Sequence, residues 1–401
     1  MKIKPVILCG GSGSRLFPGF KNVPSKQFID FGGWSLIEKT LDRIKDKIFD
    51  PPIISTNKNY INLVTKALKK RRIAKYKILL EPSKKNTAAA IISSAILDDI
   101  KLNQPILFLP SDHFIQQKEI FNKILYSNLK KLHNKNIFIF GIKPKIPRSD
   151  YGYLINKKAN KNINKVINFI EKPKKILAAK LIKKKALWNS GIVLARKDSI
   201  INNAKRYQKN LFIHCIKSFN KVDQKKKIIK LNKIFFDKIN PISFDCAILE
   251  KAKDINSIYL NISWSDLGSW SEIFNILKPQ FKNNFNKKNT FYRPWGFYKN
   301  IFKGEKFLLK ELTINRKSSI SLQKHHHRSE YWTVISGRPK ITVGKKVFFK
   351  DINESIFIPK GSVHRIENIY KRPVKIIEAQ LGTILKENDI VRYQDIYGRV
   401  K

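Results

Sequence analysis

Residues able to bind an anion lie close to the N-terminus. An apolar run at residues 5–9 leads directly into Gly10, Gly11, Ser12 and Gly13. Glycines at the end of a strand let backbone N–H groups approach an anionic ligand, and the start of a following helix adds its dipole. The spacing fits neither the dinucleotide fingerprint nor the lysine-containing phosphate loop. The turn alone therefore predicts either another kind of nucleotide loop or a plain strand-to-helix connection.

Residues able to hold a metal lie near the other end of the chain. Four of the seven histidines are at residues 325–327 and at His364, and Gln323 and Glu330 lie beside the first group. Imidazole, carboxylate and amide groups together suit Zn²⁺ or another first-row divalent metal. Three adjacent histidines could also form a solvated turn.

The elements that must position these residues differ between the two parts of the chain. In the first part, apolar runs typical of strands alternate with amphipathic segments typical of helices. The runs are at residues 5–9, 53–55, 78–80, 106–109, 137–140 and 191–195, and the helices at 36–47, 61–70 and 88–101. This alternation predicts an α/β domain over residues 1–277, with a mostly parallel sheet covered on both faces.

The second part has a different texture. Short runs rich in β-branched residues are separated by Gly, Pro or Asn from about residue 291 onward, and they predict an all-β barrel or jelly roll over residues 291–401. These runs are at residues 307–314, 332–335, 341–343, 347–350, 355–358 and 374–379. Residues 278–290 are polar, basic and Asn-rich, as is typical of a linker.

Several short motifs follow one another in the order found in sugar-nucleotide pyrophosphorylases. They are GGSGSRLFPGFKNVPSKQF at residues 10–28, EP at 81–82, NTA at 86–88, PSDH at 110–113, YGY at 151–153, FIEKP at 169–173, WNSG at 188–191, SFD at 243–245 and WSDLGSW at 264–270. The set resembles the mannose-1-phosphate guanylyltransferase branch of that family, whose domain is a Rossmann-like mixed sheet.

The resemblance implies transfer of GMP from GTP to α-D-mannose 1-phosphate, with release of pyrophosphate. Such a reaction depends mostly on positioning and charge neutralisation. Arg15 and Lys26 would hold the phosphates. Asp112, which follows a predicted strand, would hold Mg²⁺ together with Asp266 and the triphosphate.

Further residues are implied as ligand contacts. The nucleotide-binding set is Gly10, Gly11, Ser12, Gly13, Glu81, Asn86 and Thr87, the last three near the base and ribose. The sugar-phosphate-binding set is Tyr151, Gly152, Glu171, Lys172 and Asn189.

The C-terminal part resembles the cupin domain of type II phosphomannose isomerases, the isomerase half of bifunctional enzymes. The likeness rests on two cupin motifs within residues 323–337 and 359–368, and on RPWG at 293–296, SLQ at 321–323 and segment 380–399. It implies interconversion of mannose 6-phosphate and fructose 6-phosphate, which moves a proton between C1 and C2 with the help of a metal Lewis acid. A guanylyltransferase whose cupin domain is non-catalytic is the alternative.

The cupin resemblance also implies a ligand set. Gln323 and His325, two positions apart on one strand, would both project into the barrel, and Glu330 and His364 would come from neighbouring strands. His326 would face the other way, and His327 is the rival ligand. Arg392 and Lys310 are candidates for electrostatic or phosphate contact, with Arg392 the isomerase candidate.

Two departures from the family pattern are visible. Lys317 and Asn353 stand where the cupin pattern usually carries glycine. The segment between the WSDLGSW and RPWG motifs has only about 20 residues, although family members carry several dozen more. We therefore expect a shortened inter-domain segment.

The charge of the chain has two interpretations. The sequence has 81 Lys and Arg against 30 Asp and Glu, for a net charge of +51. The phosphate backbone of a nucleic acid favours binding by many Lys and Arg side chains. However, Lys, Asn and Ile are all over-used, as an AT-rich genome would produce. The sequence offers no nucleic-acid recognition fold, so we expect no specific nucleic-acid partner.

The remaining expectations concern the compartment and the partners. Cys9, Cys215 and Cys246 are widely separated, which favours a reducing compartment, and no apolar stretch is long enough for a membrane span. We expect a cytoplasmic enzyme whose partners are GTP, mannose 1-phosphate and mannose 6-phosphate or fructose 6-phosphate, with homo-oligomerisation left open.

Overall fold

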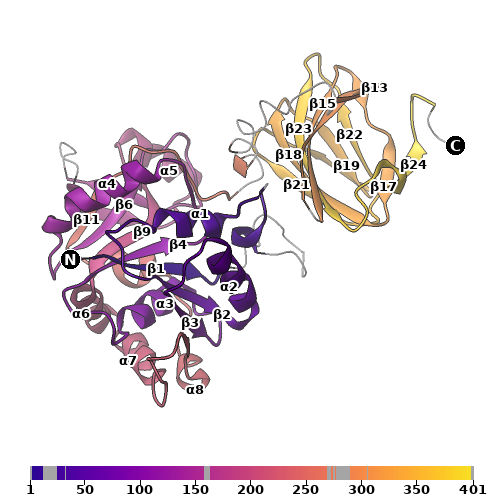
Figure 1. The fold of residues 1–401 in the computed structure, drawn as a ribbon. Coiled ribbons are helices and arrows are strands. Elements are labelled where there is room, and N and C mark those ends of the chain that lie inside the picture. The colour runs from indigo at the N-terminus through magenta and orange to yellow at the C-terminus, as the bar shows by residue number, and fades with distance from the viewer. Residues whose placement is uncertain are drawn as a thin grey trace. The chain divides into compact units, whose positions relative to one another are not determined.

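The computed structural model describes residues 2–11, 25–31, 33–157, 163–268, 272–273, 276, 290–304 and 306–398. They form two compact units (Figure 1). The first contains the N-terminal strand and Ser35–Asp266, and the second contains the described residues of Leu267–Lys401. Of the predicted linker at residues 278–290, only Thr290 is described, and it begins a strand.

The first unit is built on a ten-stranded sheet in the order β10-β3-β2-β1-β4-β9-β6-β11-β8-β7. Its strands are β1 (Lys4–Cys9), β2 (Ile53–Asn57), β3 (Lys77–Glu81), β4 (Pro105–Pro110), β6 (Ile137–Ile142), β7 (Tyr153–Asn156), β8 (Ile163–Ile170), β9 (Leu187–Arg196), β10 (Ile228–Lys230) and β11 (Ile255–Tyr259). A separate pair joins β5 (Phe114–Ile115) to β12 (Trp264–Ser265).

The sheet is mixed. The strands from β10 to β4 all pair in parallel, but β9 pairs antiparallel with both β4 and β6. The mixed sheet implied by the family resemblance is therefore confirmed, and the parallel pattern read from the apolar runs holds for only part of it. An apolar run cannot tell the direction of a strand that is buried on both faces.

Helices cover both faces of this sheet. They are α1 (Leu36–Arg43), α2 (Ile61–Lys70), α3 (Asn86–Ala95), α4 (Lys118–Asn128), α5 (Lys175–Lys183), α6 (Lys197–Tyr207), α7 (Lys209–Lys217) and α8 (Lys233–Phe236). Neighbouring residues of β1 enter opposite cores: Val6 belongs to the buried cluster that includes residues of α3, α6 and α7, whereas Ile7 belongs to the one that includes residues of α1, α2 and α4. Helix α1 ends earlier than predicted because Asp46 forms a turn, accepting from the backbone N–H of Ile48.

The second unit consists of two sheets, as predicted for a jelly roll (Figure 1). Their strands are β13 (Thr290–Arg293), β14 (Gly296–Lys303), β15 (Phe307–Ile314), β16 (Ser318–Ser319), β17 (Leu322–His325), β18 (Arg328–Ser336), β19 (Lys340–Val343), β20 (Lys346–Phe349), β21 (Ser355–Ile358), β22 (His364–Asn368), β23 (Val374–Gly382) and β24 (Ile390–Gln394). Trp332 and Ile376 of one sheet form a buried core with Ile341 and Ile366 of the other.

The two departures from the cupin pattern fall at turns with left-handed backbone. Lys317 has a φ of 49° and Asn353 a φ of 69°. Glycine adopts this region without steric cost, which is why a glycine suits both places. Asparagine tolerates the region better than lysine does, so Lys317 carries the greater strain.

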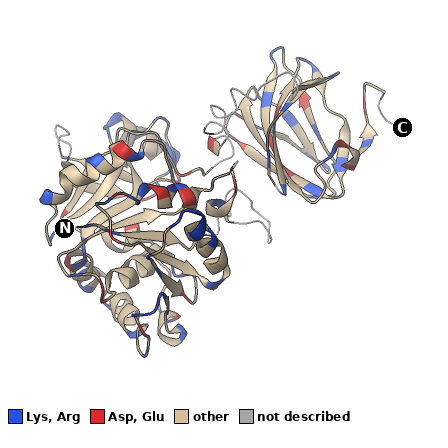
Figure 2. Cartoon of the chain, viewed as in Figure 1, with Lys and Arg blue, Asp and Glu red and all other residues tan. Residues whose placement is uncertain are grey.

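The surplus positive charge lies at the surface. Lys and Arg are scattered over both units in Figure 2. Four lysines are buried among the described residues, and each contacts an oxygen atom: Lys4, Lys26, Lys197 and Lys310. In the part of the chain that the structure describes, no helix has the length and apolar character needed to cross a bilayer.

The central strand β4 gives a stability prediction for the first unit. Leu107 is fully buried, and Leu107→Ala should lower the free energy of unfolding by about 2–5 kcal/mol because it leaves a cavity. Leu102→Ala is the control, since Leu102 is 64% exposed and should change stability by less than about 0.5 kcal/mol. Urea unfolding followed by circular dichroism measures both, and equal effects would contradict the core assignment.

Candidate active sites

Three strand ends form one edge of the sheet in the first unit. Gly10 and Gly11 follow β1, Glu81 ends β3, and Asp112 comes two residues after the end of β4. These strands belong to the parallel part of the sheet, and open α/β sheets bind ligands at the carboxyl ends of their strands. A Cβ on either glycine would meet no atom of the described residues within 4 Å. Ser12, Gly13 and Arg15, also predicted here, lie outside the described residues.

Lys26 joins two acidic residues at this edge. Its Nζ lies 2.8 Å from Asp112 Oδ2 and donates to the backbone carbonyl of Asp266. Lys26 is only 3% exposed, so its ammonium needs both contacts. Burial alone would raise the pKa of the Asp112 carboxyl, but the charges of Lys26 and His113 bring it below its ordinary value. The described members of the predicted catalytic set therefore lie together.

Tyr151 connects this edge to the neighbourhood of β7. Its hydroxyl donates to Asp266 Oδ1 at 2.5 Å. Its ring packs against Trp188 and Trp264, with centroid distances of 4.8 and 5.7 Å.

The carboxylates of Asp112 and Asp266 are hard oxygen donors, which Mg²⁺ prefers, so the donor set fits the ion that the sequence predicts.

The predicted sugar-phosphate residues lie near one another and near a further acidic residue, Asp245. Gly152 accepts from the backbone N–H of Asn189 at 2.8 Å, and a Cβ on Gly152 would meet Glu171 Oε2 at 2.7 Å. Glu171 in turn lies 3.1 Å from Lys172 Nζ. Asn189 Nδ2 donates to Asp245 Oδ1 at 2.7 Å. Burial and the charge of Glu171 raise the pKa of Asp245 to about 6.

Backbone strain marks two of the predicted ligand-binding residues. Asn86 and Lys172 have φ values of 64° and 45°. Such conformations concentrate at functional sites, where surrounding contacts maintain them. The Asn86 side chain accepts from the backbone N–H of Thr87 at 2.8 Å, and Thr87 Oγ1 accepts from the backbone N–H of Phe244 at 2.8 Å. These bonds fix the start of α3 beside the predicted nucleotide site.

A buried carboxylate forms the centre of the second site. Glu330 is 1% exposed. Its Oε1 lies 3.1 Å from His325 Nε2 and accepts from Arg328 Nε at 3.0 Å, and its Oε2 lies 3.7 Å from His364 Nε2. Burial alone would raise the pKa of Glu330, but His325, Arg328 and His364 hold it well below its usual range. The ligand atoms of His325, Glu330 and His364 all lie within 4.8 Å of one another.

Both histidines of this cluster present the nitrogen that a metal requires. His325 Nδ1 lies 3.2 Å from the carbonyl of Asp389, and His364 Nδ1 lies 2.8 Å from that of Ser362. A carbonyl can only accept, so each Nδ1 carries a proton, which leaves each Nε2 as the atom that would bind a metal. His364 Nε2 is buried with no hydrogen-bond partner in the part of the chain that the structure describes, and burial lowers the pKa of His364 to about 4. The pair is therefore suited to a divalent metal.

Gln323 completes the predicted ligand set. Its Nε2 lies 3.5 Å from His325 Nε2, and its Oε1 accepts from Ser321 at 2.8 Å. A half-turn of this amide would present the oxygen to a metal instead. His327, the alternative ligand, is bound to another group: its Nδ1 donates to Asp389 Oδ1 at 2.8 Å.

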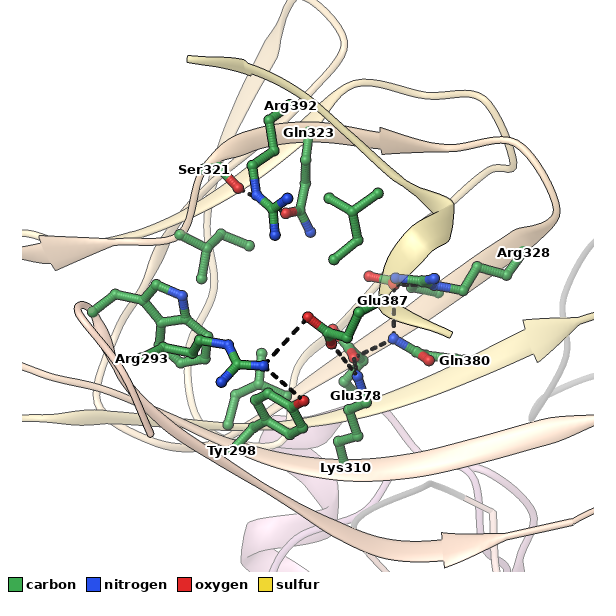
Figure 3. A pocket seen from close by; sticks show the side chains of 15 residues that line it. Arg293, Tyr298, Lys310, Ser321, Gln323, Arg328, Glu378, Gln380, Glu387 and Arg392 are labelled. Carbon is green, nitrogen blue, oxygen red and sulfur yellow. Dashed lines mark hydrogen bonds and ion pairs between the residues drawn. The ribbon is translucent and has the colours of Figure 1, made fainter. Parts of the chain in front are cut away.

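A pocket lined in part by Gln323, Arg328 and Glu330 opens beside the cluster of His325, Glu330 and His364 (Figure 3). Arg392 lies with Gln323 on one side, and Arg293 and Lys310 lie across from it around Glu387. Arg293 and Lys310 are paired with Glu387 at 3.6 and 3.4 Å, whereas Arg392 has no ion pair with any described residue. Arg392 is therefore the cation of the pocket wall that remains open to an anionic ligand.

Two family models together cover nearly all of the chain. The nucleotidyl transferase model matches residues 4–281, and the model for the C-terminal domain of mannose-6-phosphate isomerase matches residues 280–395. The chain belongs to the nucleotidyl transferase family. This membership confirms the family resemblance found in the motifs, including the isomerase domain at the C-terminal end.

Relatives of similar extent are known. The xanthan biosynthesis protein XanB of Xanthomonas campestris is 30% identical over 464 positions, covering 99% of each chain. The mannose-1-phosphate guanylyltransferase of Escherichia coli K12 is 27% identical over 476 positions, covering 100% of this chain and 99% of its own. Both alignments are longer than 401 residues, so each relative has residues that this nucleotidyl transferase lacks.

A solved structure agrees with the fold. The mannose-6-phosphate isomerase of Helicobacter pylori superposes with a TM-score of 0.58 and 25% identity, covering 66% of this chain and 100% of its own.

Several residues at the two sites of this nucleotidyl transferase were not among the predicted site residues. They are Asp245 and His113 at the first site, and Arg328, Glu378, Gln380 and Asp389 at the second. Most lie within the motif stretches quoted above, so their position was a usable signal. Glu378 lies in no motif, and only the fold brings it to the pocket.

Glu81 gives a pH prediction for the nucleotide site. Burial raises the pKa of Glu81 to about 7 from 4.5, and Ser55 Oγ donates to it at 2.6 Å. The protonated carboxyl favours folding, so this stability is complete below pH 4.5 and is lost as the pH rises through about 7. Glu81→Gln should remove that loss. The free energy of unfolding of the variant, taken relative to that of the wild type, should therefore be about 3 kcal/mol higher at pH 8 than at pH 5.

Urea unfolding at both pH values measures the effect. Glu119→Gln is the control, because the Glu119 side chain is 77% exposed. Parallel pH profiles for the wild type and Glu81→Gln would contradict the prediction.

Proposed function

We propose that the first unit transfers GMP from GTP to α-D-mannose 1-phosphate, forming GDP-mannose and pyrophosphate. The observation that carries the proposal is the convergence of Lys26, Asp112 and Asp266 at the carboxyl edge of the sheet. The named activity of the Escherichia coli relative supports it. Xanthan synthesis in the name of the other relative supports a role in supplying a polysaccharide pathway.

Each residue has a role in this reaction. Mg²⁺, held by Asp112 and Asp266, would neutralise charge on the triphosphate. Lys26 would turn from Asp112 to the α-phosphate, where its charge stabilises the transition state. Tyr151 orients the Asp266 carboxylate through its hydroxyl. Glu171, Lys172 and Asn189 would hold the sugar phosphate, and Glu81, Asn86 and Thr87 the nucleoside.

Asp112→Asn tests this assignment. The variant keeps the size of the side chain but removes the charge, so kcat for pyrophosphate release should fall about 100-fold or more. Asp99→Asn is the control, because Asp99 forms a surface ion pair with Lys77 at 3.3 Å. Wild-type protein that releases no pyrophosphate from GTP, mannose 1-phosphate and Mg²⁺ would overturn the proposal.

For the second unit, we propose a metal-dependent isomerase of mannose 6-phosphate and fructose 6-phosphate. Gln323, His325, Glu330 and His364 would hold Zn²⁺ or another divalent metal, which would polarise the carbonyl of the open-chain sugar. The tautomers of both histidines and the buried Nε2 of His364 support this ligand set.

The pocket supplies the remaining groups. Arg392 would take the substrate phosphate, since the other pocket cations are already paired with carboxylates. Glu378 would carry the proton between C2 and C1. It lines the pocket, and burial together with the charge of Glu330 raises its pKa to about 7, which suits a group that must both accept and donate.

Metal removal separates the two activities. Protein treated with chelator and then given only Mg²⁺ should keep pyrophosphate release but lose isomerase activity, as should His364→Ala and Gln323→Ala. Glu367→Gln is the control, because Glu367 pairs with Lys340 at 3.0 Å on the same domain. Isomerase activity that survives chelation and both substitutions would contradict the metal role. A metal-loaded wild type without isomerase activity would favour the non-catalytic cupin domain.

The proposed substrates also favour one compartment. We propose a cytoplasmic enzyme, because GTP and sugar phosphates are cytoplasmic metabolites and Cys9, Cys215 and Cys246 are free thiols.

A further inference from the structure

One acidic side chain outside the metal ligand set contacts the whole turn between strands β17 and β18. Asp389 lies at the end of a short 3₁₀ helix, Glu387–Asp389, just before β24. It is 6% exposed. A buried carboxylate is costly unless hydrogen bonds satisfy its oxygens, so its partners are part of the structure of the domain.

Asp389 contacts four consecutive residues, from the end of β17 to the start of β18. Its Oδ1 accepts from the backbone N–H of His326 at 3.1 Å and from His327 Nδ1 at 2.8 Å. Its Oδ2 accepts from the backbone N–H of His327 at 3.3 Å and lies 3.6 Å from Arg328 NH1. The backbone carbonyl of Asp389 lies 3.2 Å from His325 Nδ1. One residue therefore contacts every position from His325 to Arg328.

Two of these four residues contact the central carboxylate of the proposed metal site. His325 Nε2 lies 3.1 Å from Glu330 Oε1, and Arg328 Nε donates to the same oxygen at 3.0 Å. The turn also includes His326, which is exposed, and His327, whose side chain is 48% exposed. A backbone bond from Thr383 N–H to the His327 carbonyl at 3.3 Å holds one end of this exposed turn. The three hydrogen bonds to the Asp389 carboxylate hold both of its residues.

We propose that Asp389 is a positioning residue for the cupin metal site. Its carboxylate fixes the turn that carries His325 and Arg328, and thereby sets the distance between His325 Nε2, Glu330 and His364. It holds no metal itself, because both of its oxygens are used by the turn. This inference rests on the proposed metal site and adds to it the residue that keeps the ligands in register.

Asp389→Asn is the variant that tests it. The substitution keeps the shape of the side chain and the backbone carbonyl that meets His325, but replaces one accepting oxygen with a donor. The affinity for Zn²⁺ should fall about 10–100-fold, as is typical when a partner behind a metal ligand is lost. Isomerase activity should recover in part at saturating metal, and pyrophosphate release by the other unit should not change.

The measurement is competition for Zn²⁺ between the full-length protein and a chromogenic chelator. The visible spectrum of the Co²⁺-loaded protein is a second readout, since it reports ligand geometry and not overall stability. Asp351→Asn is the matched control, because Asp351 is an exposed acid of the same domain that pairs with Arg338 at 3.1 Å. The melting temperature of the metal-free protein shows whether each variant folds.

Three results would be decisive. Weaker Zn²⁺ binding and an altered Co²⁺ spectrum in a variant that melts like the wild type would support the positioning role. Unchanged Zn²⁺ affinity and spectrum would overturn it. Wild-type protein that binds neither metal would instead overturn the proposed metal site.

Discussion

The carboxylate of Glu330 is the interaction on which the second unit depends. A lone carboxylate with 1% exposure would cost more than the domain could tolerate, so its neighbours must supply positive charge and hydrogen bonds. Arg328 and Trp332 of its own strand β18 and Gln380 of β23 donate hydrogen bonds to it. From the other sheet, His325 of β17 and His364 of β22 bring their Nε2 atoms to within 3.1 and 3.7 Å of its oxygens. Because these strands belong to both sheets, closing the jelly roll and assembling the site are the same event.

The first unit solves a related problem with the opposite charge. Lys26 is a buried cation, satisfied by the carboxylate of Asp112 and by the main chain of Asp266. Both sites therefore contain a compensated buried ion before any substrate arrives. In each unit, a buried charge is among the groups proposed to bind phosphate or metal. Removing its partners would leave that charge uncompensated.

Motifs predicted the residue types at both sites because chemistry restricts them strongly. Lys26, Asp112, Asp266 and the ligand set around Glu330 could all be named from the sequence, and the structure brings them together. The partners of these residues were harder to predict. Glu378 reaches the pocket only through the register of β23 against β15 and β18, which no local pattern encodes.

Strand direction was also beyond the reach of the sequence pattern. Strand β9 is buried along most of its length, like its neighbours, and an apolar run has the same appearance in either direction. The family motifs supplied the mixed sheet instead. Helix ends were misjudged where a side chain caps a turn, as Asp46 does after α1. In each case the missing information lay in contacts between segments distant in sequence or in a single hydrogen bond.

The main-chain carbonyls behind the two histidines have a consequence for how this protein can change. The protons on His325 and His364 end on peptide oxygens of Asp389 and Ser362, which every amino acid provides. The choice of tautomer is therefore insulated from substitution at either position, provided that the backbone path is kept. In a chain so rich in lysine, asparagine and isoleucine, this arrangement allows surface residues to be substituted while the Nε2 atoms of both histidines keep facing the proposed metal site.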